Sequence, residues 1–359
     1  MECIFCKNKT HNMIYRAERM PLFQNKVYCS YESAQKAFTG DVTLLQCSNC
    51  GYAHNSTFDS SKMQYDKNYQ NEQAHSDVFK DYLNSIIDLL KENGFLGKKI
   101  IEIGCGKGYF LNELWKHGFD AIGFDPAYEG NDSRIIKDYF SQKYSTFDAD
   151  LIILRHTLEH IENPVQFIKN IPIASSKNTK IYIEVPSFEW IIDRNAFWDI
   201  FFEHCNYFSS NCLCNMFEDS KHGLLFNGQY QYVIGTLNKI DFSSKEYAPS
   251  VISWDSLITC RDKYKNFIND HQDILLWGAG AKAATFLNFM DPDKKNISAV
   301  IDINPKKQHK YIAKTGHKII PPKDLYNIDG GDILVMNENY INEIEEVVDT
   351  NKFQLHILR

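Results

Sequence analysis

An acidic side chain and an imidazole stand next to each other in an aromatic stretch of the sequence. Glu203 and His204 lie within "FFEHCNYFS", between Phe201 and Tyr207. Apolar surroundings raise the free-energy cost of an unpaired charge, so the pair must be hydrogen-bonded or used in chemistry. A neutral imidazole can accept a proton near pH 7, and a neighbouring carboxylate can fix its tautomer. The stretch therefore indicates acid–base chemistry, with a buried pair that holds a loop as the alternative.

A glycine-rich turn between an expected strand and an expected helix predicts a cofactor site. The stretch "KKIIEIGCGKGYFLNELWKHG" places Gly104, Gly106 and Gly108 after an apolar run, and glycine lets the backbone come close to a ligand. A dinucleotide turn has the pattern G-x-G-x-x-G/A, but Tyr109 stands at its third small position. The pattern G-x-G-x-G, preceded by Glu102, instead resembles the S-adenosylmethionine (SAM) turn of class I methyltransferases. There the acid usually faces the methionine end of the cofactor.

A second acidic residue ends the next expected strand. The stretch "DAIGFDP" brings Asp125 and Pro126 to that point, seventeen residues after Gly108. An acid in this position can accept both hydroxyls of a ribose. We therefore expect Asp125 and Pro126 to contact the cofactor, and we favour a nucleoside cofactor over a strand–helix turn without a ligand.

The segment "RHTLEHIENP" is expected to form a loop at the carboxyl end of a buried strand. Open α/β sheets hold their ligands at that end, and Asn163 with Pro164 marks the beginning of the following helix. His156, Glu159 and His160 also match the inverted zinc-protease motif H-x-x-E-H. That motif needs both histidines on one helical face, so we reject it here. We expect His156 to be a hydrogen-bonded wall residue of the cofactor site, and His160 to be structural or catalytic.

Four cysteines have the spacing of a metal site. Cys3-x-x-Cys6 and Cys47-x-x-Cys50 can supply four thiolates to a tetrahedral zinc ion. Their gap is longer than in most zinc ribbons, so four unrelated thiols are the alternative. The zinc would be structural, because four thiolates leave no open coordination position. Cys29, between the pairs, is expected to pack as a small hydrophobic residue.

A second glycine turn lies near the C-terminus. In "DILLWGAGAKAATF", Gly278, Gly280 and Ala283 match the dinucleotide pattern, and Asp302 ends the following strand. Three interpretations remain open: a nicotinamide site, a helix N-terminus that receives acceptor phosphates together with Lys282, and a structural Rossmann-like module. We favour the last two, because about a hundred residues make only half of a full dinucleotide fold.

Hydrophobic periodicity divides the chain of 359 residues into three expected modules. They are a zinc-binding module (1–60), an α/β core with a mostly parallel sheet and an antiparallel hairpin (61–240), and a C-terminal Rossmann-like α/β module (250–359). The resemblance of its glycine turn implies that the core is a class I SAM methyltransferase domain. The polar stretch 241–250 is typical of a linker. The sequence "NG" at 227–228 predicts the turn of the hairpin.

Charge and hydropathy narrow the classes of partner. The net charge of -7 argues against a nucleic-acid partner, which needs a basic face. No apolar run approaches the length of a membrane span, and the N-terminus has no signal-peptide layout. We therefore expect a cytoplasmic protein without membrane contact, either a monomer or a homodimer, with a small-molecule partner.

Taken in order, these features resemble the three-module deoxysugar C-methyltransferases. The resemblance rests on the four-cysteine module, "EIGCGKG", "HTLEHI" and "EHCNYFS", and it continues into "WGAGAKAATFLNFM" and "VIDINPKKQHKYI". In that family, SAM methylates a carbon next to a keto group of a nucleotide-linked sugar. The resemblance implies that His204 is the base, that Glu203 orients it or holds a sugar hydroxyl, and that His160 stabilises the enolate oxygen. Making a carbon nucleophile requires such a base and such a stabiliser.

The sequence departs from the family pattern at the acceptor. Phe201 stands where the family usually has a tyrosine, and Asn71 replaces a second tyrosine in "YDKNYQNEQAHSD". The expected acceptor contacts are Tyr69, Asn71, Phe201, Tyr207, Gly280 and Lys282. Three other functions remain open: an O- or N-methyltransferase on another small metabolite, a nicotinamide-dependent oxidoreductase using the third module, and a non-catalytic partner.

Overall fold

The computed structural model describes residues 2–66, 68–172, 178–237, 239 and 254–359. The linker predicted at 241–250 lies outside the described residues. Among the described helices, none combines the length and the apolar content that crossing a bilayer requires.

A seven-stranded sheet forms the core and positions the first glycine turn. Its strand order is β11-β12-β9-β8-β5-β6-β7, and β12 alone runs antiparallel to its neighbours. The strands are β5 (Lys99–Ile103), β6 (Asp120–Phe124), β7 (Ile135–Ile136), β8 (Leu151–Arg155), β9 (Lys180–Pro186), β11 (Ser220–Leu225) and β12 (Tyr230–Thr236). The predicted mostly parallel sheet and the hairpin about residues 227–228 are both confirmed.

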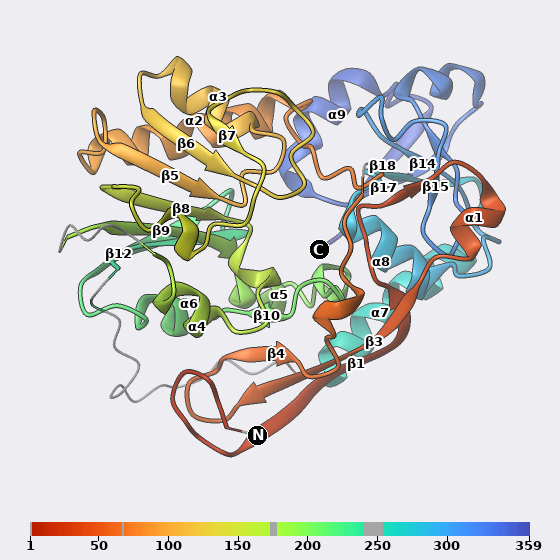
Figure 1. The fold of residues 1–359 in the computed structure, drawn as a ribbon. Helices are drawn as coiled ribbons and strands as arrows, with labels where there is room; N and C mark the ends of the chain where they lie inside the picture. Colours follow the sequence, from red (N-terminus) through yellow and green to blue (C-terminus); the bar gives the residue numbers. More distant parts are fainter. Residues whose placement is uncertain (1, 67, 173–177, 238, 240–253) are drawn as a thin grey trace.

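Helices cover both faces of this sheet because its buried strands are apolar on both faces. Within β8, Ile153 packs on the side of α2 and α3, while Ile152 and Leu154 pack on the opposite side. Figure 1 shows α2 and α3 above the sheet, and α4, α5 and α6 below it. The helical segments are α2 (Asp77–Glu92), α3 (Tyr109–Lys116), α4 (Pro164–Lys169), α5 (Phe188–Asp193), α6 (Ser210–Cys214) and the 3-10 turns η1 (Ser60–Lys62), η2 (Gln142–Tyr144), η3 (Leu158–His160) and η4 (Phe197–Asp199).

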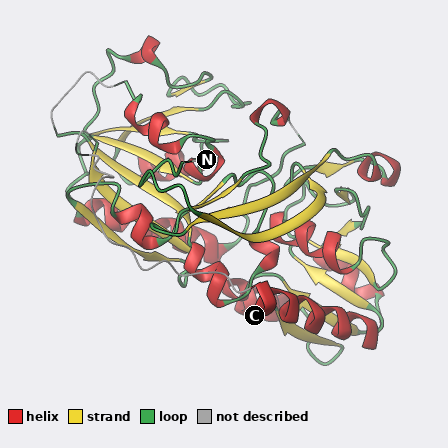
Figure 2. Ribbon diagram, turned by 90° about the horizontal axis from the view of Figure 1, so that it is seen from below, coloured by secondary structure: helices red, strands yellow, loops and turns green. Residues whose placement is uncertain are grey.

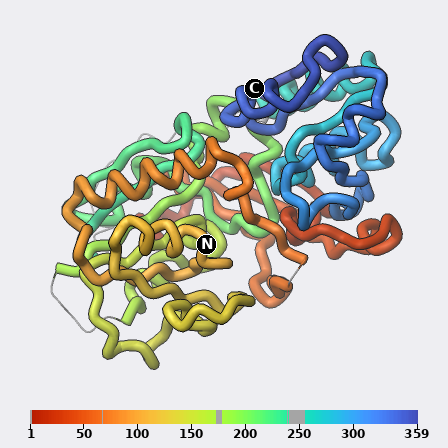
Figure 3. Tube along the Cα trace, turned by 90° about the horizontal axis from the view of Figure 1, so that it is seen from above, coloured from red at the N-terminus to blue at the C-terminus, as the bar shows by residue number. Residues whose placement is uncertain are grey.

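The third module has a five-stranded parallel sheet of order β16-β14-β13-β17-β18. Its elements are α7 (Trp254–Asp270), β13 (Ile274–Trp277), α8 (Ala281–Met290), β14 (Ile297–Ile301), β16 (Ile319–Ile320), η5 (Pro322–Asn327), β17 (Gly331–Val335), η6 (Glu338–Tyr340), α9 (Ile341–Val347) and β18 (Phe353–Ile357). Figure 2 shows helices lying against the sheets, and Figure 3 shows this module, in blue, beside the core. The predicted strand–turn–helix unit is β13 followed by α8.

The N-terminal segment joins the other two modules. Strands β1 (His11–Pro21), β3 (Thr39–Cys47) and β4 (Ala53–Asn55) form an antiparallel sheet whose fourth strand, β10 (Asn206–Tyr207), belongs to the core segment. Strand β2 (Val27–Tyr28) pairs with β15 (Tyr311–Ile312) of the third module, next to α1 (Tyr31–Gln35). In Figure 1, β1 and β3 run below both α/β modules. The segment "EHCNYFS" is therefore held partly by residues near the N-terminus.

A substitution at Gly40 tests the contact between the N-terminal segment and the "EHCNYFS" region. A Cβ atom at Gly40 would overlap the Phe202 ring and approach Leu22 Cδ2 to 2.9 Å. Overpacking of this kind costs about 1–3 kcal/mol. We expect Gly40→Ala to lower the free energy of unfolding by that amount in a denaturant titration. The exposed neighbour Thr39 supplies the control, because Thr39→Ala should change it by less than about 0.5 kcal/mol. Equal stability of the two variants would show that Phe202 is free to move.

Candidate active site

A cavity of about 660 Å³ lies between the core and the third module. It brings together both glycine turns, the "HTLEH" segment and the Glu203–His204 pair, although these are far apart in the sequence. The predicted site residues that line it are Tyr69, Asn71, Glu102, Gly104, Gly106, His156, His160, Phe201, Glu203, His204, Gly280 and Lys282. Among the predicted residues, Gly108, Asp125, Pro126 and Tyr207 are described by the structure but do not line this cavity.

The three glycines of the first turn have different reasons to be glycine. All three have positive φ angles, and a Cβ atom at Gly104 would overlap Thr157 while one at Gly108 would overlap Ile135. A Cβ atom at Gly106 would meet no atom within 4 Å. Gly104 and Gly108 thus serve the packing of the chain, whereas Gly106 leaves room for a ligand beside the backbone.

Asp125 holds the first glycine turn through hydrogen bonds to backbone amides. Its Oδ2 accepts a hydrogen bond from the Gly106 amide at 2.8 Å, and its Oδ1 accepts one from the Ala127 amide at 2.8 Å. Burial raises the pKa of this carboxyl above its usual value, against those two amide bonds. The geometry gives Asp125 a structural task that the sequence pattern does not reveal, and a ribose contact stays a prediction.

Glu102 is a buried carboxyl group with an unused oxygen on the cavity wall. The residue is 3% exposed, and its Oε2 has no hydrogen-bond partner among the described residues. Burial raises the pKa of Glu102 to about 7, although the charge of Arg155 opposes the shift. A buried, unpartnered acid facing a cavity fits the ammonium group of a ligand. This is the feature of the site that best suits the methionine end of SAM.

An ionic network around the fully buried Glu184 supports the neighbouring wall. Arg155 makes a two-point contact with Glu184, at 3.0 and 3.2 Å, and Tyr182 donates to the same carboxylate at 2.6 Å. His156 Nε2 lies 3.0 Å from Glu184 Oε1. Burial alone would lower the pKa of His156, but Glu159 and Glu184 raise it to about 9. His156 is therefore an ion-paired wall residue.

The carboxylate of Glu203 is held by the segments that precede α2. Its Oε2 accepts hydrogen bonds from Tyr69 at 2.9 Å and Tyr65 at 3.4 Å, and its Oε1 accepts one from the Gln24 amide at 3.1 Å. No hydrogen bond joins this carboxylate to the ring of His204 among the described residues. The adjacent acid therefore does not fix the tautomer of His204. Sequence reasoning missed Tyr65 and Gln24, although Tyr65 stands four residues before Tyr69.

The rings of His160 and His204 meet edge to face at the cavity wall. Their centroids are 4.8 Å apart and their planes are inclined by 84°. Burial, followed by the nearby His160 and His156, lowers the pKa of His204 well below its usual value. Phe201 covers the ring of His204 at 4.7 Å between centroids. His204 is therefore a neutral imidazole in a largely apolar enclosure.

Two of the predicted acceptor contacts have partners of their own. The hydroxyl of Tyr207 accepts a hydrogen bond from the Phe201 amide at 2.9 Å and donates one to the Phe201 carbonyl at 3.2 Å. These two bonds fix the backbone between Phe201 and Tyr207. Lys282 Nζ lies 2.9 Å from Asp199 Oδ2 and 4.4 Å from the Trp190 ring centroid. Lys282 reaches the cavity, but its charge is already balanced by Asp199.

In the second glycine turn, the acidic side chain hydrogen-bonds to nearby backbone amides. Asp302 accepts hydrogen bonds from the Ala279 amide at 2.8 Å and the Asn304 amide at 2.7 Å. Lys307 donates to the Ala279 carbonyl at 3.0 Å and lies 3.8 Å from Asp302. These contacts engage both carboxylate oxygens of Asp302. The turn therefore has fewer free hydrogen-bond acceptors for a second nucleoside than its sequence pattern suggests.

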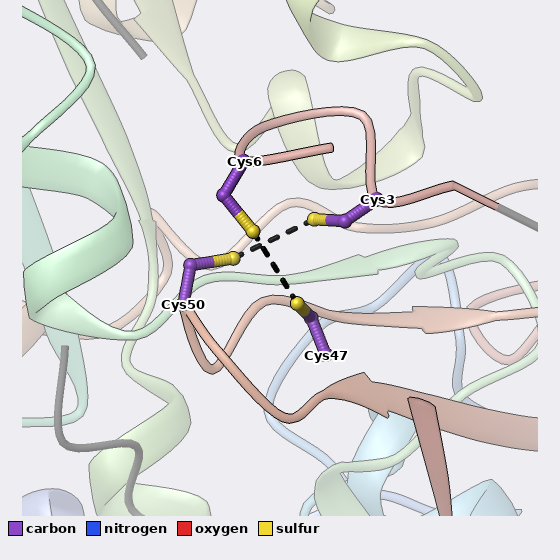
Figure 4. Close-up of side chains that lie close together, drawn as sticks. All are labelled: Cys3, Cys6, Cys47 and Cys50. Atoms are coloured by element: carbon purple, nitrogen blue, oxygen red, sulfur yellow. Dashed lines mark hydrogen bonds between the residues drawn. The ribbon is translucent and has the colours of Figure 1, made fainter. Parts of the chain in front are cut away.

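The four predicted metal ligands converge. The Sγ atoms of Cys3 and Cys50 are 3.5 Å apart, as are those of Cys6 and Cys47, and all four lie within 4.8 Å of one another (Figure 4). Zinc–sulfur bonds of 2.3 Å in a tetrahedron require sulfur atoms about 3.8 Å apart. The cluster therefore fits a structural zinc ion. Cys29 is exposed, so the expectation that it packs as a buried residue is wrong.

The sheet order, with one antiparallel strand beside β9 and a glycine turn after β5, defines the class I SAM methyltransferase fold. Comparison with protein families agrees. Residues 47–221 match the family described as "Methyltransferase domain", and residues 257–352 match "C-methyltransferase C-terminal domain". The chain therefore contains a segment that matches a methyltransferase domain and a segment that matches the C-terminal domain of C-methyltransferases.

Known proteins resemble parts of the chain. The C-methyltransferase NovU of Streptomyces niveus is 25% identical over 159 residues, 40% of this chain and 37% of that relative. A SAM-dependent methyltransferase of Archaeoglobus fulgidus is 18% identical with a TM-score of 0.32, over 43% of this chain and 94% of the other. A possible histamine N-methyltransferase of Thermotoga maritima is 17% identical with a TM-score of 0.30, over 44% and 98%. The chain thus spans little more than a third of NovU.

Replacing a predicted zinc ligand should empty the thiolate cluster. We expect Cys47→Ser to lose the zinc measured by elemental analysis and to lower the Tm by several degrees, because metal binding contributes to the folding free energy. Cys29→Ser, at an exposed cysteine outside the cluster, should change neither. Full zinc retention in Cys47→Ser would remove this residue from the ligand set.

The raised pKa of Glu102 predicts pH-dependent binding of SAM. An ammonium partner favours the carboxylate, so below pH 7 binding must first remove the proton that Glu102 carries. The affinity should therefore weaken as the pH falls below about 7, by up to about tenfold per pH unit. Calorimetry in two buffers of different ionisation enthalpy would detect the released proton. A pH-independent affinity, or the same slope in Glu102→Gln, would contradict this role.

Proposed function

We propose that the protein is a SAM-dependent C-methyltransferase that methylates a carbon next to a keto group of a nucleotide-linked sugar. The observation that carries this proposal is one cavity lined by the SAM-type turn, by the His160–His204 pair and by the turn of the third module. In this proposal the cofactor, the proton acceptor and the nucleotide share that cavity. The likeness to the C-methyltransferase NovU supports transfer to carbon.

The donor side of the cavity suits SAM, which supplies an electrophilic methyl group when bound. Glu102 would hold the ammonium group, and Gly106 would let the backbone lie against the cofactor. The neighbouring Arg155–Glu184 network keeps the wall rigid, since each charge is paired inside the protein. These residues bind and orient, and they take no part in moving a proton.

The reactive side needs a base, and His204 has the required state. Its ring is neutral and shielded by Phe201, so it can remove a proton from a carbon acid without competition from water. His160 Nδ1 lies 2.9 Å from the carbonyl oxygen of Glu203, and a carbonyl only accepts, so Nδ1 carries a proton. With Nδ1 bound to this carbonyl, the Nε2 side of the His160 ring is left to face an enolate oxygen.

The acceptor side combines hydroxyl-binding and cationic groups. Glu203, with Tyr69 beside it, can accept from a sugar hydroxyl. Asn71 and Lys107 line the same cavity, as do Lys307 and the beginning of α8. Lysines near a helix N-terminus attract phosphates, which supports a nucleotide-linked acceptor. The thiolate cluster would carry a structural zinc ion that takes no part in this chemistry, because its four sulfur ligands leave no open coordination position.

The proposal is tested by ligand binding and turnover. Thermal shifts with SAM, its demethylated product (SAH) and NAD should show stabilisation by the first two only. Turnover is then measured with a panel of nucleoside-diphosphate ketosugars, and nuclear magnetic resonance distinguishes a new carbon–methyl bond from an oxygen–methyl bond. A response to NAD alone, or methyl transfer to oxygen or nitrogen, would replace the proposed reaction.

His204→Gln separates chemistry from binding. A general base contributes about 10²–10⁴-fold to a rate, so turnover should fall by at least about a hundredfold while the affinity for SAM stays within about twofold. The exposed His222 provides a matched control, because His222→Gln should keep full turnover. Parallel losses of turnover and SAM affinity in His204→Gln would assign His204 a structural role.

A further inference from the structure

Three potential metal ligands meet at the reactive end of the cavity, apart from the four cysteines. Glu159 and His160 lie on η3, and His204 lies just before β10. One ligand atom from each of the three residues falls within 4.8 Å of the other two. All three residues line the cavity, so a group bound by them would be open to small molecules on one side.

Glu159 is the unexplained member of this cluster. The residue is 1% exposed, and neither of its carboxylate oxygens accepts a hydrogen bond among the described residues. Its nearest cationic neighbour is His156, whose Nδ1 lies 3.4 Å from Oε1, and His156 is shared with Glu184. A buried carboxylate costs free energy unless a proton, a donor or a cation compensates it. The proposed methyl transfer gives Glu159 no task.

His160 has the arrangement that metal-binding histidines usually have. Its Nδ1 carries the proton donated to the carbonyl oxygen of Glu203 at 2.9 Å, so the neutral ring keeps a lone pair on Nε2. Such a hydrogen bond to the second nitrogen fixes the tautomer and the orientation of a ligating imidazole. The ring of His204 accepts and donates no hydrogen bond among the described residues, which leaves it available as a second nitrogen ligand.

We propose that Glu159, His160 and His204 bind a divalent cation of borderline softness, such as Zn²⁺ or Co²⁺, at a second site distinct from the thiolate cluster. Two imidazoles and one carboxylate suit such first-row ions better than Mg²⁺ or Ca²⁺, which take oxygen ligands. Tetrahedral coordination with bonds of 2.0–2.1 Å requires ligand atoms about 3.3 Å apart. The three ligand atoms lie within 4.8 Å of one another, so binding of an ion would draw them closer together.

The consequence for activity rests on the proposed function. The cation would use the lone pair with which His204 accepts the substrate proton, and it would occupy the Nε2 side of the His160 ring that faces the enolate oxygen. Cation binding and proton transfer therefore exclude each other. The site makes the enzyme sensitive to inhibition by Zn²⁺, and insensitive to Mg²⁺.

Cobalt distinguishes the two sites spectroscopically in the full-length protein. Thiolate ligands give Co²⁺ an intense sulfur-to-metal charge-transfer absorption, which a site of nitrogen and oxygen ligands lacks. Titration of metal-free protein with Co²⁺ alone should show two binding events per chain, and only one should carry the charge-transfer band. A single event accompanied by that band would overturn the second site.

Variants assign the second event to its ligands. Glu159→Gln and His204→Gln should each weaken it at least about tenfold, because loss of a ligand should cost no less than loss of an outer-shell partner. Glu162→Gln, at the exposed acid three residues further along, should leave it unchanged. The thiolate band reports that each variant is folded, and an unchanged second event in both ligand variants would refute the assignment.

The competition is tested separately from binding. The assay uses a nucleoside-diphosphate ketosugar that the enzyme methylates. Zn²⁺ should inhibit the reaction in the concentration range that fills the second site, and a chelator should restore the rate. Mg²⁺ should have no effect on the rate. Full turnover with the second site filled would refute the competition. Because the Co²⁺ titration needs no acceptor, its failure would remove the cation site and leave the proposed methyl transfer standing, whereas absence of turnover would leave the titration result intact.

Discussion

The geometry of the reactive loop depends on one buried residue, Glu203. Its carboxylate binds Gln24 and Tyr69, which precede the core sheet in the chain, while its carbonyl oxygen accepts from His160 on η3. These bonds connect the N-terminal segment, the loop before β10 and the loop after β8. A buried carboxylate is costly without partners, so each of the three segments depends on the other two for its position. The position of His204 depends on all three.

The parts of the fold that the sequence predicts are those whose signals are local. The turn at Gly104, Gly106 and Gly108 is readable because backbone conformation and close packing restrict those positions to glycine. The hairpin about residues 227–228 follows from turn chemistry that involves a few neighbouring residues. The convergence of the cysteine pairs follows from ligand valence, because each pair alone cannot complete a tetrahedron.

The parts that the sequence does not predict depend on distant partners. The pairing of Glu203 with Gln24 joins residues 179 positions apart, and no periodicity reports such a contact. Adjacency of Glu203 and His204 suggests that one acts on the other. The carboxylate of Glu203 instead binds the N-terminal segment, while the ring of His204 packs against His160 and Phe201. The backbone hydrogen bonds of Asp125 and Tyr207 are likewise absent from the sequence pattern, because residue type alone does not report which nearby amide a side chain binds.

The N-terminal segment lies across the two α/β modules, and this has a mechanical consequence. Strand β4 pairs with β10 of the core, while β2 pairs with β15 of the third module. The connecting strands β1 and β3 therefore join the two modules. A hinge motion that widened the cavity would have to break one of these two pairings or bend β1 and β3. It would also separate Phe197 and Trp198 of η4 from Phe286 of α8, with which they share a buried core. The strand pairings and this shared core therefore hold the two modules in one arrangement around the cavity.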